Sequence, residues 1–73
     1  MNDSNGQSEH KGILKAIKVA GSERKLAKAL GVERAFIYRL KKGLCDVPVK
    51  RVADFIRVTD GKVRKHDLRP DLW

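Results

Sequence analysis

Residue types that carry chemistry are scarce in this chain of 73 residues. Cys45 is its one cysteine, so an internal disulfide is excluded. His10 and His66 are too far apart in sequence for the ligand spacing of a zinc site. No glycine-rich phosphate loop, paired carboxylates or Ser/His/Asp set stands at a catalytic spacing. The sequence therefore predicts no enzyme, no cofactor and no metal site.

Long apolar runs are missing too, because nothing approaches the roughly 20 residues needed to span a bilayer, and no signal peptide opens the chain. These absences predict a soluble, cytoplasmic protein without membrane contact.

Acidic residues are few, with nine against 17 basic ones, so the net charge is +8. Such a basic chain suggests a polyanionic partner. Its length, at 41% hydrophobic, allows one domain with a small helical core.

Residues 22–42 contain two short helical patterns on either side of Gly31-Val32. An apolar residue recurs where each helix would face the other: Leu26, Ala27, Leu30, Val32, Ile37 and Leu40. Ser22 is a candidate N-cap, and Gly31 and Gly43 are candidate helix ends. Seven basic and two acidic residues give residues 22–43 a net charge of +5. The pattern predicts helices over about 23–30 and 34–42, arranged as a helix-turn-helix that presents its second helix to a DNA major groove.

The flanking segments complete the predicted organisation. Residues 1–9 are polar and are expected to form a disordered tail, which leaves 10–73 as the domain. A first helix is expected from residue 10 or 11 to residue 20, with Ile13, Leu14 and Ile17 on its inner face and Gly21 at its end.

The segment after Gly43 admits two structures. Val49, Val52, Ala53 and Ile56 recur at helical spacing after Pro48, whereas Asp60-Gly61 is a known hairpin-turn signal. We favour the helix, because Pro48 would block strand pairing and Ala53 is a poor strand residue. A last short helix is then expected within 63–68. The predicted fold is all-α with about five helices, and the alternative is α+β with a C-terminal β-hairpin.

From about residue 13 to residue 71 the chain resembles phage Cro-type repressors and the related YdaS-type antitoxin regulators. The resemblance lies in LAKALGVERAFIYRLKKG, VPVKRVADFIRVTDGKV and HDLRPDLW, of which the last two are the more specific. It implies the all-helical branch of Cro proteins. It also implies a sequence-specific, double-stranded DNA-binding transcriptional regulator, a phage or prophage repressor on an inverted-repeat operator in a bacterial host cell. The antitoxin resemblance implies the alternative, a regulator whose main partner is a toxin protein.

The family pattern places base contacts on the outer face of the second helix of the motif, at Arg34, Ala35, Tyr38 and Arg39. Arginine can donate two parallel hydrogen bonds to guanine, alanine can touch a thymine methyl group, and the tyrosine hydroxyl can bond a base or a phosphate. We expect contacts to the DNA backbone from a second set: Ser22, Lys25, Lys28, Glu33, Lys41 and Lys42.

Two large apolar residues, Phe55 and Trp73, are predicted to form a dimer or partner interface, because such groups near the surface of a small domain often do so. Core packing is the alternative for Phe55, and a frayed terminus is the alternative for Trp73. One recognition helix reads only a few base pairs, so a weak homodimer formed on DNA is expected.

Overall fold

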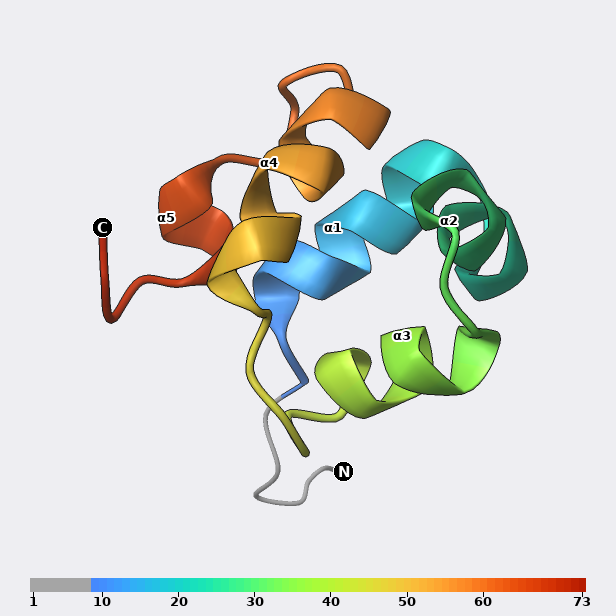
Figure 1. The fold of residues 1–73 in the computed structure, drawn as a ribbon, viewed down its shortest axis with the longest axis horizontal. Helices are drawn as coiled ribbons and strands as arrows, with labels where there is room; N and C mark the ends of the chain where they lie inside the picture. Colours follow the sequence, from blue (N-terminus) through green and yellow to red (C-terminus); the bar gives the residue numbers. More distant parts are fainter. Residues whose placement is uncertain (1–8) are drawn as a thin grey trace.

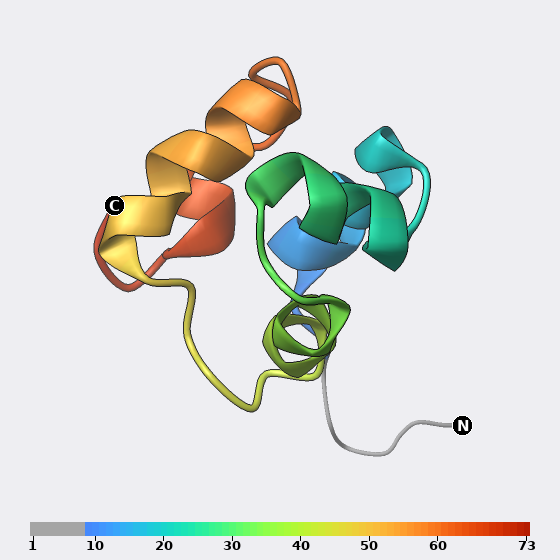
Figure 2. The same ribbon diagram turned by 45° about the vertical axis from the view of Figure 1, so that its right-hand side comes forward.

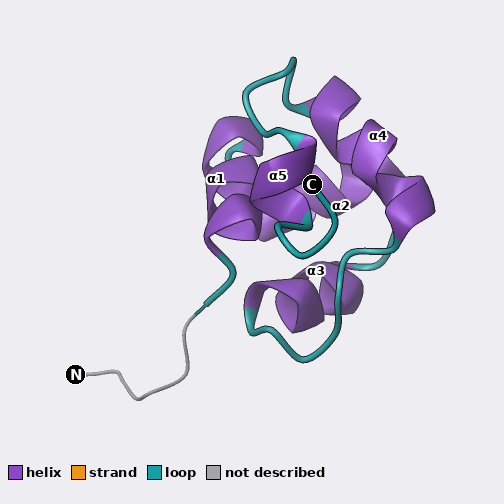
Figure 3. Ribbon diagram, turned by 90° about the vertical axis from the view of Figure 1, so that its left-hand side faces the viewer, coloured by secondary structure: helices purple, strands orange, loops and turns teal. Residues whose placement is uncertain are grey.

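The computed structural model describes residues 9–73, and within them it contains five helices and no strand (Figures 1 and 3). The helices are α1 (Lys11–Ala20), α2 (Glu23–Leu30), α3 (Arg34–Lys41), α4 (Val49–Val58) and α5 (Lys65–Leu68). The all-α prediction is confirmed, and the β-hairpin alternative is wrong for this chain. Of the predicted tail, residues 1–8 lie outside the described residues.

Helix α1 runs through the middle of the fold and packs against α2, α3 and α5, while α4 packs against α2 and α5 (Figure 1). Turned by 45°, the molecule shows α3 nearly end-on below α2 (Figure 2). Every helix contributes to one hydrophobic core, whose largest fully buried apolar side chains are Phe55, Ile13, Leu26, Ile37, Leu40, Leu68, Val47 and Val63. The two halves of the chain therefore share one core, and the helix-turn-helix rests on it.

Helix α2 begins and ends where the sequence predicts. The Ser22 hydroxyl accepts a hydrogen bond from the backbone N–H of Lys25 at 3.1 Å, which satisfies one of the free donors of the first turn. Gly31 adopts the left-handed conformation that suits glycine after a helix, with φ 74° and ψ 31°. Short local signals therefore fix the tight turn between α2 and α3.

The first turn of α1 meets the backbone of α5. His10 caps α1, because its Nδ1 accepts from the N–H of Ile13 at 3.3 Å, and its Nε2 lies 3.0 Å from the carbonyl oxygen of Leu68. A Cβ added to Gly12 would lie 2.2 Å from the carbonyl oxygen of Asp67. Glycine at position 12 thus lets the two helices approach at backbone distance.

The inner face of α1 differs in one position from the prediction. Ile13 is fully buried and Ile17 packs against the core, but Leu14 is 37% exposed. Ala16, with no exposed area, takes the inner position instead. Gly12, Ile13 and Ala16 form the buried face of α1, with Gly12 against α5, and Leu14 lies outside this face and is exposed to solvent. The prediction for Leu14 is therefore wrong.

Asp60-Gly61 ends α4 rather than turning a hairpin. Thr59 is fully buried, and its hydroxyl donates to the carbonyl of Phe55 at 2.8 Å and accepts from the N–H of Val63 at 3.2 Å. Asp60 and Gly61 have positive φ values of 56° and 78°. The hydroxyl thus fastens the chain beyond the turn to the end of α4, which brings buried Val63 into the core.

The segment after α5 is held to the loop that precedes α4. Arg69 donates from Nη1 to the carbonyl of Val47 at 2.9 Å and forms an ion pair with Asp71 at 2.8 Å. The hydrogen bond from Arg69 holds the pKa of Asp71 below its ordinary value of 3.8, and the same bond raises the pKa of Arg69. This clamp fixes the path of the chain toward Trp73.

Candidate nucleic-acid interface

Helix α3 divides its side chains cleanly between core and solvent. Ile37 and Leu40 have no exposed area, and Phe36 packs partly buried against the core. The residues predicted to contact bases are all exposed: Arg34, Ala35, Tyr38 and Arg39. The helical period places these four on the side opposite Ile37 and Leu40. The structure therefore brings the predicted base-contacting residues onto one outward face.

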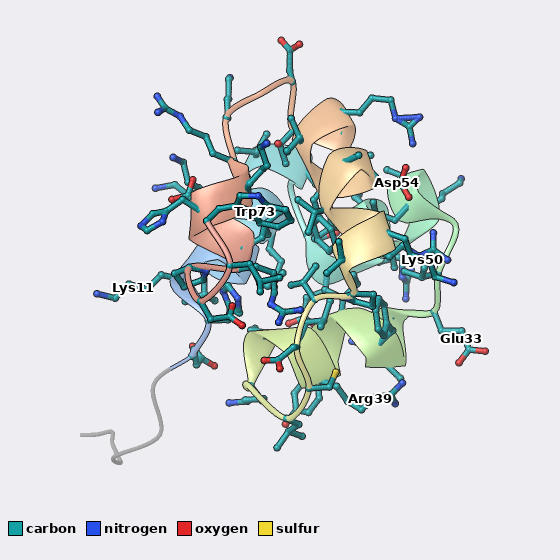
Figure 4. The ribbon with its side chains drawn as sticks, turned by 60° about the vertical axis from the view of Figure 1, so that its left-hand side comes forward. Lys11, Glu33, Arg39, Lys50, Asp54 and Trp73 are labelled. Atoms are coloured by element: carbon teal, nitrogen blue, oxygen red, sulfur yellow. The ribbon has the colours of Figure 1, made fainter. Side chains whose placement is uncertain are left out.

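Part of this face is hollowed. Arg34, Ala35 and Tyr38 line a depression of about 300 Å³ on the surface of α3. Arg39 projects outward from the same helix, and Glu33 projects from the residue just before it (Figure 4). Glu33 occupies the N-cap position but makes no capping hydrogen bond with its side chain, so its carboxylate is free to face a ligand.

A second hollow, of about 620 Å³, joins the first turn of α2 to the start of α3. It is lined by Ile17, Ser22, Glu23, Arg24, Lys25 and Arg34. Ser22 and Lys25 were predicted to contact the DNA backbone, and the structure sets them beside Arg34. Arg24 belongs to the same hollow and was missed. Its place in the first turn, beside the predicted N-cap, was a usable signal, because helix N-termini favour phosphate groups.

Lys41 has a partner inside the motif. Its Nζ lies 2.6 Å from the Glu23 carboxylate, its side chain is 18% exposed, and it stands 5.3 Å from the centre of the Tyr38 ring. The ion pair joins α2 to α3 across the turn. The structure thus shows Lys41 tied to α2, and the phosphate contact expected of it stays a prediction.

Lys42 and Lys28 remain available to a ligand to different degrees. Lys28 is exposed in the last turn of α2. Lys42 is 42% exposed and pairs with Glu9 at 3.1 Å. The hydrogen bond and charge of Glu9 raise the pKa of Lys42 above its ordinary value.

Phe55 and Trp73, the two residues predicted to form an interface, differ in their exposure to solvent. Phe55 has no exposed area and sits in the core, so the interface role predicted for it is wrong. Its position on the inner face of α4 is the physical reason, because burying the largest side chain of that helix stabilises a small core. Trp73 is 45% exposed and lies between α4 and α5 (Figure 4).

Among residues 9–73 no three His, Cys, Asp or Glu side chains lie close enough together to hold a metal ion. None of the helices described is long and apolar enough to cross a membrane.

A five-helix fold in which α2 and α3 form a helix-turn-helix with a basic and aromatic outer face on α3 defines a small helix-turn-helix regulator. The family model described as bacterial toxin YdaS matches residues 13–73, and the chain belongs to this family. The chain is also similar to a solved structure, the Cro protein from the putative prophage element Xfaso 1 in Xylella fastidiosa strain Ann-1. Identity is 39%, the match covers 85% of this chain and 94% of that one, and the TM-score is 0.77. The comparison with curated proteins finds no match.

Proposed function

We propose that this protein is a sequence-specific regulator that inserts α3 into the major groove of double-stranded DNA, as a Cro-like phage or prophage repressor. The observation that carries the proposal is the outward face of α3, where Arg34, Ala35, Tyr38 and Arg39 are exposed over a fully buried Ile37 and Leu40. The likeness to a prophage Cro protein supports it.

Each base-contacting residue has a distinct task in this proposal. Arg34 and Arg39 donate paired hydrogen bonds to guanine O6 and N7, each worth about 1–3 kcal/mol of discrimination against other bases. Ala35 touches a thymine methyl group, and the Tyr38 hydroxyl bonds a base edge or the sugar-phosphate wall. Glu33, at the start of α3, is placed to accept from a cytosine amine or to adjust the approach of the backbone.

The first turn of α2 and the last turns of α2 and α3 hold the phosphates. The backbone contacts come from the basic hollow with Ser22, Arg24 and Lys25, and from Lys28 and Lys42. These contacts add affinity without reading sequence, and they make binding weaken as salt concentration rises. The net charge of +8 steers the protein toward DNA.

Two copies occupy one operator in the proposed complex. A single α3 reads too few base pairs for specificity in a genome, and two half-sites roughly 34 Å apart on one face of the duplex double the information. The pairing is weak and forms on DNA, where a bound pair blocks a promoter. The site of action is then the cytoplasm of the bacterial host, where the DNA lies.

Selection of bound duplexes from a random pool tests the proposal directly. We expect a palindromic consensus whose half-sites are separated by about one helical turn. A pool that never departs from random, while the protein still binds every duplex with a steep salt dependence, would show that charge alone drives binding.

A further inference from the structure

A groove between α4 and α5 lies apart from the proposed DNA face. It consists of two adjoining hollows of about 400 and 320 Å³, which share Ile56, Lys65 and Trp73, and we call it the α4–α5 groove. None of its lining residues belongs to the proposed DNA contacts, and Figure 4 shows Trp73 on a different side of the molecule from Arg39. The groove is therefore a second surface, independent of the first.

The floor of the groove is an apolar face of α4 that the other residues described by the structure leave open. Val49, Ala53 and Ile56 follow one another at four- and three-residue spacing, so they lie along one side of the helix. Val49 is 54% exposed and Ala53 is exposed as well. An apolar stripe of this kind receives the apolar side chains of a partner segment.

Trp73 stands where the two hollows meet. The ammonium of Lys65 lies 5.5 Å from the centre of its indole ring, and His66 forms a hydrogen bond with its backbone carbonyl. The ring is thus held in place while 45% of the residue stays exposed. Tryptophan in a desolvated pocket is a frequent anchor of protein interfaces, because it offers a large apolar surface with little loss of side-chain entropy.

The charges that line the groove have one sign. Arg64 and Lys65 line it together with His66, and no aspartate or glutamate side chain of residues 9–73 does. Neither Arg64 nor Lys65 takes part in an ion pair between side chains of residues 9–73. The nearby Asp67 carboxylate accepts a hydrogen bond from the backbone N–H of Arg64 at 2.9 Å. The rim therefore favours an occupant that brings negative charge.

We infer that the α4–α5 groove binds a protein segment whose apolar side chains are flanked by several carboxylates. A second copy of this chain fits poorly, because its nine acidic residues are scattered singly and its net charge is +8. Pairing two such grooves would bring two basic rims together, which is unfavourable. The acidic partner and the DNA occupy separate faces, so the protein holds both at once.

The single tryptophan of the chain makes the groove directly observable. Two short amphipathic peptides serve as probes, with the same leucine and phenylalanine positions but with glutamate in one and lysine in the other. We expect the glutamate peptide to shift the Trp73 emission to shorter wavelength with saturation. The lysine peptide should leave the emission unchanged at the same concentrations.

Matched variants locate the effect. Ala53→Glu places a carboxylate on the groove floor and should weaken binding of the glutamate peptide at least tenfold, whereas Ala29→Glu, on an exposed position of α2, should not. Lys65→Gln should weaken it more than Lys62→Gln, because Lys62 does not line the groove. DNA binding by the Ala53 variant should be unchanged.

Three results would overturn the inference. Equal binding of both peptides would show that charge does not select the occupant. No emission shift with either peptide would show that the groove does not bind such a segment. An emission shift on concentrating the protein alone, with a dimer in sedimentation, would assign the groove to a second copy. None of these results bears on DNA selection by α3, so the two proposals fail separately.

Discussion

The helix-turn-helix, formed by α2 and α3, and the C-terminal region from α4 onward are built in different ways. Helix α2 is capped by residues at its own two ends, with Ser22 at the start and Gly31 at the finish. Helix α5 has only four residues, and it depends on the contact with Gly12 and on the hydrogen bond between His10 and Leu68. Local signals thus set the limits of α2, whereas contacts between residues far apart in the sequence hold α5 in place.

The two regions also differ in what they show to solvent. Helix α3 exposes arginines and a tyrosine, while α4 exposes Val49 and Ala53 beside Trp73. A charged face suits a phosphate-rich ligand, and an apolar face with a basic rim suits a protein. A small domain can therefore carry two interfaces of different chemistry when one core supports both.

The largest effect is expected where the two regions meet in the core. Phe55→Ala should lower the free energy of unfolding by about 3–5 kcal/mol, because it leaves a cavity under α4. Urea denaturation followed by circular dichroism measures the loss. If the Phe55→Ala variant kept its stability but lost oligomerisation, Phe55 would belong to an interface and not to the core.

Replacing Gly12 with alanine should push α5 away from the first turn of α1. An exposed glycine within a helix usually gains up to about 1 kcal/mol when replaced by alanine. Gly12→Ala should instead cost about 1–3 kcal/mol, because its Cβ would collide with the carbonyl of Asp67. Lys15→Ala, on the exposed face of α1, is the matched control. A more stable Gly12 variant would show that α5 is not held at that distance.

Arg39→Ala tests whether α3 alone reads sequence. Affinity for the selected duplex should fall by about 1–3 kcal/mol, while affinity for random duplex changes little. Lys28→Ala, at an exposed position outside the reading face, should weaken both duplexes alike. Electrophoretic mobility shifts at fixed salt measure both affinities. Parallel losses for the arginine variant would mean that it contacts phosphate only.

The smallest effect concerns the clamp between Arg69 and Asp71. The pKa of Asp71 is lowered in the folded protein, so this pair stabilises the fold above the ordinary pKa of 3.8 and stops doing so as pH falls through the lower folded value. Asp71→Asn should reduce stability slightly at neutral pH and not at all in acid. Urea midpoints of both proteins across this range show whether their curves converge.

The sequence predicted the helices well where the signals are short. Residues 23–30 form a helix with the expected limits, because Ser22 and Gly31 act on their own neighbours. Asp60-Gly61 was ambiguous, since the same pair suits a hairpin turn and a helix end. What decides between them is the hydroxyl of Thr59 and the burial of Val63.

The candidate site was predictable in part for the same reason. Helical periodicity places Arg34, Ala35, Tyr38 and Arg39 on one face, and the structure exposes all four. The partner of Lys41 lies 18 residues away along the chain, in α2, so periodicity could not reveal it. Periodicity also could not reveal that Phe55 is buried while Trp73 is exposed, because burial depends on how α4 and α5 pack.

The ion pair between Glu23 and Lys41 has a consequence for how such a protein changes its target. Lys41, Ile37 and Leu40 anchor α3, and none of these residues is among those proposed to read bases. In the proposed complex, substitutions at positions 34, 35 and 39 would change the base preference while the ion pair and the buried side chains that anchor α3 stay in place. Position 38 differs, because the Tyr38 ring lies 5.3 Å from the Lys41 ammonium of that anchor. A new base preference at the other three positions would therefore need no change in the scaffold.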